Sequence, residues 1–90
     1  MSLRFVGVDP ESPHDESPTV WVDEETGDLI IQSWVADEAT IRQAQEAGSA
    51  PGHSTTVPPG ETVIRLPARM RRFLSEAYEA GGVDRAATRA

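Results

Sequence analysis

The chain has 90 residues, of which 38% are hydrophobic and 26% are charged, so it is typical of one small globular domain and not of a globally disordered protein. Fifteen acidic and eight basic side chains give a net charge of −7, which repels phosphate backbones and disfavours general binding to nucleic acid. Because the chain contains no cysteine, a disulfide framework and a thiolate metal site are both excluded.

The first residues lack the charged start and long apolar core of a signal peptide, and no apolar run approaches the roughly 20 residues that span a membrane. We therefore expect a cytoplasmic protein without a membrane segment. A chain of this length buries only about 60–65% of the surface that its unfolded form exposes, so its stability as a monomer is marginal. Association with a second copy would add buried surface.

The first predicted element is a short strand at residues 3–8, which ends at an Asp-Pro pair. Simple alternation places Leu3 and Phe5 on one side of this strand and Val6 and Val8 on the other. The ten residues that follow contain three prolines and four acidic side chains, which predicts a solvated loop.

A β-hairpin is predicted over residues 19–34, because two apolar runs flank a four-residue turn that ends in Gly27. Glycine is suited to this position because it adopts a positive φ without strain. With Asp23 facing Asp28, the register fixes the cross-strand partners. The predicted pairs are Val22 with Leu29, Trp21 with Ile30, and Val20 with Ile31.

Both faces of this hairpin are apolar, and a chain of this size can cover only one of them with its own helices. One face is aliphatic and is the natural core face. The other face is predicted to carry Trp21, Ile30 and, farther along, Trp34. Exposed aromatic side chains at the centre of a patch are typical anchors of protein interfaces. We therefore predict that these three residues form a protein interface, with coverage by the chain's own segments as the alternative.

After the hairpin, the sequence predicts a weakly anchored helix from Asp37, which suits an N-cap, to Ala47, with Gly48 as the stop. Its apolar stripe is short and is centred on Ile41. Residues 48–60 contain three prolines and three glycines, so we expect a flexible loop there.

A strand is predicted at residues 61–66, followed by the strongest helix of the chain over Pro67–Ala80, with proline at its first position. The apolar residues of this helix follow the spacing of one buried stripe. The stripe comprises Met70, Phe73, Leu74, Ala77 and Tyr78. Two glycines end the helix, and residues 83–90 are expected to fray.

Together these elements predict an α+β fold in a single domain over residues 1–82. It consists of a small, mainly antiparallel sheet of three to four strands, one strong C-terminal helix and one weaker helix. The four candidate strands are placed in one sheet, and the C-terminal helix is expected to pack on its aliphatic face.

No candidate metal, cofactor or catalytic site has the required set of residues. His14, Asp15 and Glu16 are neighbours in one loop and do not converge on a point, and only His53 is left to complete a metal site. No serine lies in the Gly-x-Ser-x-Gly turn of a nucleophile, and no glycine-rich phosphate loop follows a strand. We therefore predict a protein that is not an enzyme and that holds no metal or cofactor.

Arg69, Arg71 and Arg72 lie in the first turns of the last helix, where the helix dipole favours negative charge. One interpretation is a solvated face. A second docks these arginines on acidic groups of this chain or of a partner chain, such as those between Asp23 and Asp28. A third, direct DNA binding through the three arginines, lacks a helix-turn-helix motif and conflicts with the net charge.

The runs from Pro18 to Trp34 and from Glu61 to Met70 resemble a group of small actinobacterial proteins that is loosely similar to the BldB developmental-regulator family. Members of this group are usually encoded near helix-turn-helix regulators. The resemblance implies a non-enzymatic, homodimeric accessory protein that binds such a regulator. It also allows an antitoxin-like partner of a toxin as an alternative function. The residues of the 48–60 loop and of the C-terminal tail depart from the group's pattern.

Overall fold

The computed structural model describes residues 2–13 and 16–81. The chain forms two compact units. Unit 1 combines Met1–Ser33 with Leu66–Ala90, and unit 2 comprises Trp34–Arg65. Each unit has its own antiparallel sheet and its own α-helix, so the predicted α+β class is confirmed.

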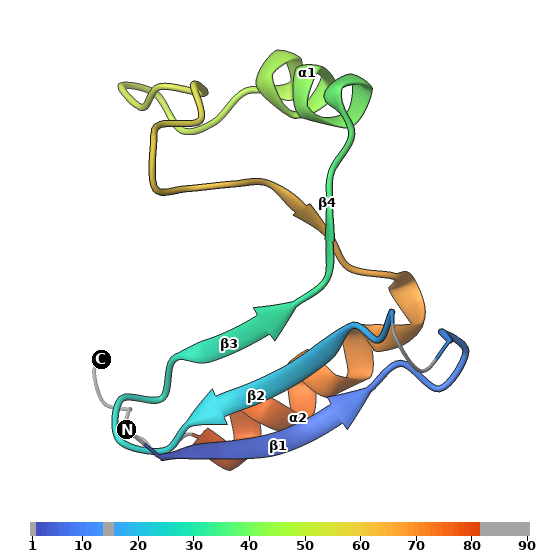
Figure 1. The fold of residues 1–90 in the computed structure, drawn as a ribbon. Helices are drawn as coiled ribbons and strands as arrows, with labels where there is room; N and C mark the ends of the chain where they lie inside the picture. Colours follow the sequence, from blue (N-terminus) through green and yellow to red (C-terminus); the bar gives the residue numbers. More distant parts are fainter. Residues whose placement is uncertain (1, 14–15, 82–90) are drawn as a thin grey trace. The chain divides into compact units, whose positions relative to one another are not determined.

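Unit 1 contains a three-stranded antiparallel sheet in the order β1-β2-β3 (Figure 1). Its strands are β1 at Leu3–Val8, β2 at Thr19–Asp23 and β3 at Leu29–Gln32. β2 is the central strand and is the most buried, because it has a neighbour on each side and the helix of unit 1 lies across one of its faces.

The predicted hairpin register is confirmed for all three expected pairs between β2 and β3. The backbone N–H of Asp23 donates to the Asp28 carbonyl at 2.8 Å and closes the turn. Gly27 has a φ of 82°, the left-handed conformation for which a glycine was expected at this position.

A β-bulge interrupts the pairing of β1 with β2 and changes the faces predicted for β1. Phe5 pairs with Trp21 and Gly7 with Val20, so Val6 is the extra residue of the bulge. Beyond it, Val8 pairs with Thr19 and lies on the same face as Phe5. The predicted position of Val8 opposite Phe5 was therefore wrong, because the extra residue reverses the alternation.

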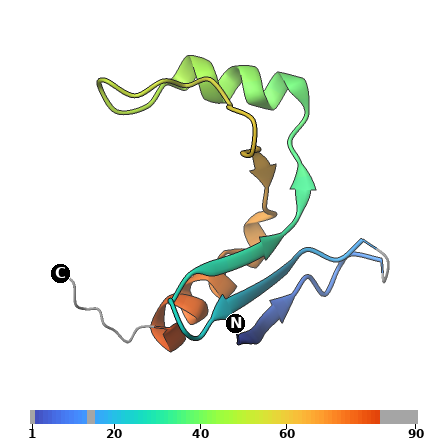
Figure 2. The same cartoon turned by 60° about the vertical axis from the view of Figure 1, so that its left-hand side comes forward.

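The core of unit 1 lies between this sheet and α2, which spans Arg71–Gly81 and follows a short 3₁₀ turn at Ala68–Met70 (Figures 1 and 2). Pro67 precedes this turn as its N-cap, so the helix predicted from Pro67 begins as a 3₁₀ turn and continues as α2. The buried cluster consists of Val20, Met70, Phe73 and Ala77. Packing of the C-terminal helix on the Val20 face is thus as predicted.

Phe73 packs directly against the backbone of β1 at Gly7. A Cβ atom added to Gly7 would lie 2.3 Å from the Phe73 ring, which is far inside van der Waals contact. Gly7 does not have a positive φ, so the position requires glycine for space and not for backbone conformation.

Tyr78 does not belong to the buried stripe, because 77% of it is exposed. At about 100° per residue, Tyr78 is turned by about 140° from Phe73 around the helix axis. The three-stranded sheet covers only one side of the helix, and Tyr78 lies outside that side. The prediction for Tyr78 was therefore wrong, whereas Met70, Phe73 and Ala77 are buried as expected.

Unit 2 contains α1 at Glu38–Ala47 and a two-stranded sheet of β4 at Trp34–Val35 and β5 at Ile64–Arg65. The Asp37 side chain caps α1 by accepting from the Thr40 N–H at 2.8 Å, and Gly48 ends the helix with a φ of 87°. Both ends of this helix are as predicted. None of its residues is buried.

The predicted single sheet of four strands was wrong in its last strand. The strand expected at residues 61–66 is reduced to the two residues of β5, and β5 pairs with β4 instead of joining the sheet of unit 1. The chain leaves β3 after Gln32, so the expected strand over residues 28–34 is divided between two sheets.

Residues 48–60 contain turns but no helix or strand, and their flexibility stays a prediction. The tail predicted to fray, residues 83–90, lies outside the described residues. Within the described ranges, neither helix is both long enough and apolar enough to cross a membrane.

Candidate protein interface

The face of the β1-β2-β3 sheet that lies opposite α2 carries a continuous apolar row, and we call it the outer face. Phe5 pairs with Trp21, and Trp21 pairs with Ile30, so these three side chains stand next to one another across three strands. Trp21 is at the centre of the row because β2 is the central strand.

The side chains of the outer face remain accessible to solvent. Phe5 is 58% exposed and Ile30 is 36% exposed, while Trp21 between them is half-buried. Leu3 and Val8 extend the apolar surface along β1 and are 44% and 40% exposed. Apolar side chains that gather on one face of a monomer are typical of protein-binding surfaces.

Along the central strand β2, one polar residue lies on each side of the apolar row. Thr19 is buried, and its hydroxyl donates to the Ser17 carbonyl at 2.7 Å. Asp23 is also buried, and its carboxylate accepts from the Glu25 N–H at 2.9 Å. Both polar groups are therefore satisfied within the chain, on either side of Trp21 along β2.

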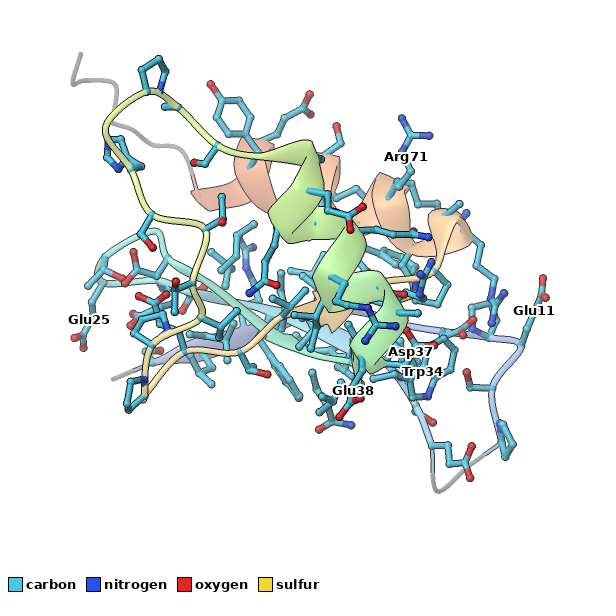
Figure 3. All side chains as sticks on the ribbon, turned by 90° about the horizontal axis from the view of Figure 1, so that it is seen from above. Glu11, Glu25, Trp34, Asp37, Glu38 and Arg71 are labelled. Atoms are coloured by element: carbon cyan, nitrogen blue, oxygen red, sulfur yellow. The ribbon has the colours of Figure 1, made fainter. Side chains whose placement is uncertain are left out.

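Of the three residues predicted for the interface, the structure brings Trp21 and Ile30 together in the row. Trp34 is 39% exposed but belongs to β4 in unit 2, where it pairs with Arg65. Figure 3 labels it with Asp37 and Glu38, which precede and begin α1. Trp34 is therefore not a member of the row.

Phe5 takes the third place in the row and was missed as an interface residue. The alternation along residues 3–8 placed Phe5 on one face of its strand. The sequence did not say which strand would be its neighbour, or that Phe5 would stand opposite Trp21. The sequence signal that could have pointed to Phe5 is that five of the six residues of β1 are uncharged and most are apolar.

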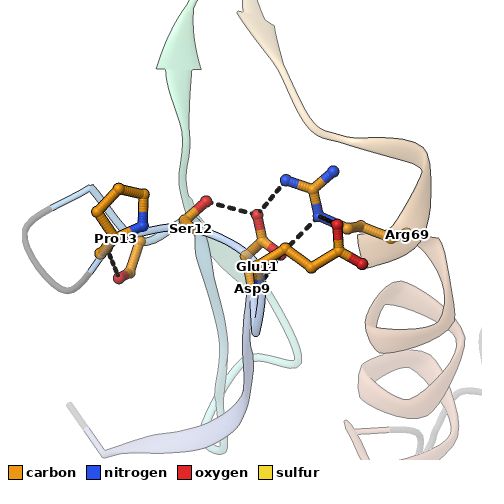
Figure 4. Close-up of polar contacts among 6 residues, drawn as sticks. Asp9, Glu11, Ser12, Pro13 and Arg69 are labelled. Atoms are coloured by element: carbon orange, nitrogen blue, oxygen red, sulfur yellow. Dashed lines mark hydrogen bonds and ion pairs between the residues drawn. The ribbon is translucent and has the colours of Figure 1, made fainter.

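One interpretation of the sequence was that Arg69 docks on an acidic group. Arg69 is paired with a carboxylate, but with that of Asp9 and not with one of the hairpin turn. Its Nε and Nη2 atoms each donate to a different oxygen of Asp9 at 2.7 Å (Figure 4). The Glu11 carboxylate lies farther away, at 3.8 Å from Nε. This pair ties the end of β1 to the turn that precedes α2.

Asp9 has no accessible surface on its side chain and accepts four hydrogen bonds. Besides the two from Arg69, they come from the Ser12 hydroxyl at 2.6 Å and the Glu11 N–H at 3.0 Å. These donors, Arg69 first, hold the pKa of Asp9 well below its ordinary value of 3.8, although burial opposes the shift. A carboxylate has about four acceptor positions, so the hydrogen bonds within the fold occupy all of those of Asp9.

The other two arginines of the predicted group are exposed. Arg71 extends away from the ribbon in Figure 3. The Arg72 guanidinium lies over the ring of Phe73, 4.7 Å from the ring centroid, and thereby covers one side of a core residue. At the hairpin turn, Glu24 is paired instead with Arg4 at 3.3 Å.

The residues weighed for metal binding do not form a cluster among the described positions. Glu16 and His53 are exposed, and the backbone N–H of His53 belongs to a turn and donates to the Ala50 carbonyl at 3.1 Å. His14 and Asp15 lie outside the described residues.

Comparisons of the chain with protein-family models, with curated proteins and with solved structures found no match. The similarity to the BldB developmental-regulator family thus rests on the sequence pattern alone and stays a prediction.

Proposed function

We propose that this protein is a non-enzymatic, protein-binding accessory module of the cytoplasm that self-associates through its outer face. The observation that carries the proposal is the exposed row of Phe5, Trp21 and Ile30 on the side of the sheet opposite α2. Two large aromatic rings and a branched aliphatic chain side by side on one face of a sheet are typical anchors of an interface.

The geometry of β1 favours association through the face over strand addition at the β1 edge of the sheet. β1 is an edge strand and would otherwise offer its backbone groups to another chain. The bulge at Val6 and the charged Arg4, which is paired with Glu24, both hinder regular pairing along this edge. The accessible apolar surface therefore lies on the face itself.

The arginines support a protein-binding function better than a DNA-binding one. Arg69 is engaged in two hydrogen bonds with a buried carboxylate, and Arg72 lies against Phe73. Arg71 alone does not form a basic surface on a chain of net charge −7. A DNA-binding regulator as the protein partner is what the resemblance to the BldB family implies, and we include it in the proposal.

The test of self-association compares two substitutions that place the same charge on different surfaces. Phe5→Asp puts a carboxylate on the most exposed member of the row, and Tyr78→Asp puts one on α2, where the native side chain is 77% exposed. We expect Phe5→Asp to lower the mass measured by light scattering to that of the monomer, while Tyr78→Asp keeps the wild-type mass. Equal masses for both folded variants and the wild type would refute an interface on the outer face.

A further inference from the structure

The strand register arranges the outer face as three rows of three residues. The row nearest the hairpin turn is Leu3, Asp23 and Asp28, the middle row is Phe5, Trp21 and Ile30, and the row at the opposite end is Val8, Thr19 and Gln32. One end row thus carries two carboxylates, and the other end row is uncharged. The three β1 residues of this face, Leu3, Phe5 and Val8, are all apolar.

Two copies of a three-stranded face can meet about a two-fold axis in two simple ways. If the axis runs along the strands, β1 of one copy faces β3 of the other, and the hairpin turns lie at the same end. Leu3 of each copy then faces the exposed Asp28 of the other. This arrangement buries an apolar side chain against a carboxylate at two symmetric positions, which is unfavourable.

If the axis runs across the strands, β1 faces the second copy's β1, and the hairpin turns lie at opposite ends. Every member of the middle row then faces its own counterpart. The end rows meet each other, so Leu3 faces Val8 and Asp28 faces Gln32, while Asp23 and Thr19 are buried within their own chain. Apolar residues meet apolar ones, and the exposed carboxylate of Asp28 meets an uncharged amide.

We propose that the occupant of the outer face is a second copy of this chain, packed with its strands antiparallel, so that Asp28 of each copy lies against Gln32 of the other. This inference rests on the proposed self-association and adds the identity and orientation of the contact. The two copies join as a sandwich of two sheets about 10 Å apart, with α2 of each copy on the outside.

Charge substitutions at Gln32 test this orientation, because both Gln32 and Asp28 are exposed. Gln32→Glu sets a carboxylate against Asp28 of the second copy, and we expect the dimer dissociation constant to rise about tenfold in sedimentation equilibrium. The matched variant Gln32→Lys places a positive charge at the same position, and it should bind more tightly than Gln32→Glu, with a difference that shrinks at high salt.

The double variant Gln32→Glu with Asp28→Lys should restore the affinity lost in Gln32→Glu. The two positions are about 13 Å apart along one strand, so they cannot form an ion pair within a chain. Circular dichroism verifies that each variant is folded. If the double variant is not restored and the Gln32→Glu and Gln32→Lys dimers are equally weak, the antiparallel orientation is refuted. If the wild type is monomeric at all concentrations, the proposed self-association itself fails.

Discussion

The contact between Gly7 and Phe73 makes Gly7→Ala a sharp test of how the sheet of unit 1 packs on α2. The new methyl group would lie 2.3 Å from the ring, whereas ordinary contact begins at 3.4 Å. The ring or the strand must therefore move by about 1 Å in a close-packed core. Such overpacking costs about 1–3 kcal/mol in the free energy of unfolding.

The backbone conformation at Gly7 has the opposite effect on the free energy of unfolding. Because its φ is not positive, alanine fits the conformation and would otherwise stabilise the strand by about 0.5–1 kcal/mol relative to glycine. Together the two effects leave a net loss of about 1 kcal/mol, which lowers the melting temperature by roughly 4–8 °C in a domain of this size. Thermal unfolding followed by circular dichroism measures this shift.

The same Gly7→Ala substitution in a Phe73→Leu variant provides the control. The smaller side chain leaves room for the methyl group, so Gly7→Ala should cost at least about 1 kcal/mol less in Phe73→Leu than in the wild type. A neutral or stabilising Gly7→Ala, or an equal cost with Phe73 and with Leu at position 73, would show that the Phe73 ring does not pack on Gly7.

Three further predictions concern the core and the buried ion pair. Met70→Ala removes a fully buried side chain and should cost about 2–5 kcal/mol in urea unfolding, and a cost below 1 kcal/mol would place Met70 outside the core. Tyr78→Ala should change stability by less than about 0.5 kcal/mol, and a large loss would show that Tyr78 is buried. The lowered pKa of Asp9 means that its carboxylate stabilises the fold above the unfolded-state pKa of about 3.9, and that this contribution is lost as the pH falls below it. Asp9→Asn should therefore unfold at a lower temperature than the wild type at pH 7, and the gap should narrow below about pH 4; a gap that is constant from pH 7 to pH 3 would contradict the pairing.

Local signals explain which parts of the fold could be predicted. The turn around Gly27, the N-cap at Asp37 and the stop at Gly48 each depend on a few adjacent residues, and all three are as predicted. The hairpin register follows from the turn, because its length fixes which residues face each other.

Features that depend on contacts distant in sequence were not predictable in this way. The bulge at Val6 follows from how β1 pairs with β2 and packs on Phe73, and alternation within β1 carries no sign of it. Similarly, the bond between Asp9 and Arg69 joins residues 60 positions apart, and several other carboxylates were equally suitable by charge.

The candidate interface also combines features that local sequence predicts with features that depend on contacts distant in sequence. Trp21 and Ile30 were placed on one face because they lie on one hairpin. Trp34 was added by extending the alternation past Gln32, but the chain leaves the sheet there, and β4 pairs with β5 instead. Phe5 entered the row through the pairing of separate strands, which the sequence alone did not specify.

Sedimentation equilibrium of the wild-type protein over a range of concentrations tests most directly whether the outer face binds a second copy. We expect a mass near twice the chain mass of 9.7 kDa at high concentration, falling toward 9.7 kDa on dilution. A mass that stays at 9.7 kDa up to millimolar concentration would contradict this expectation.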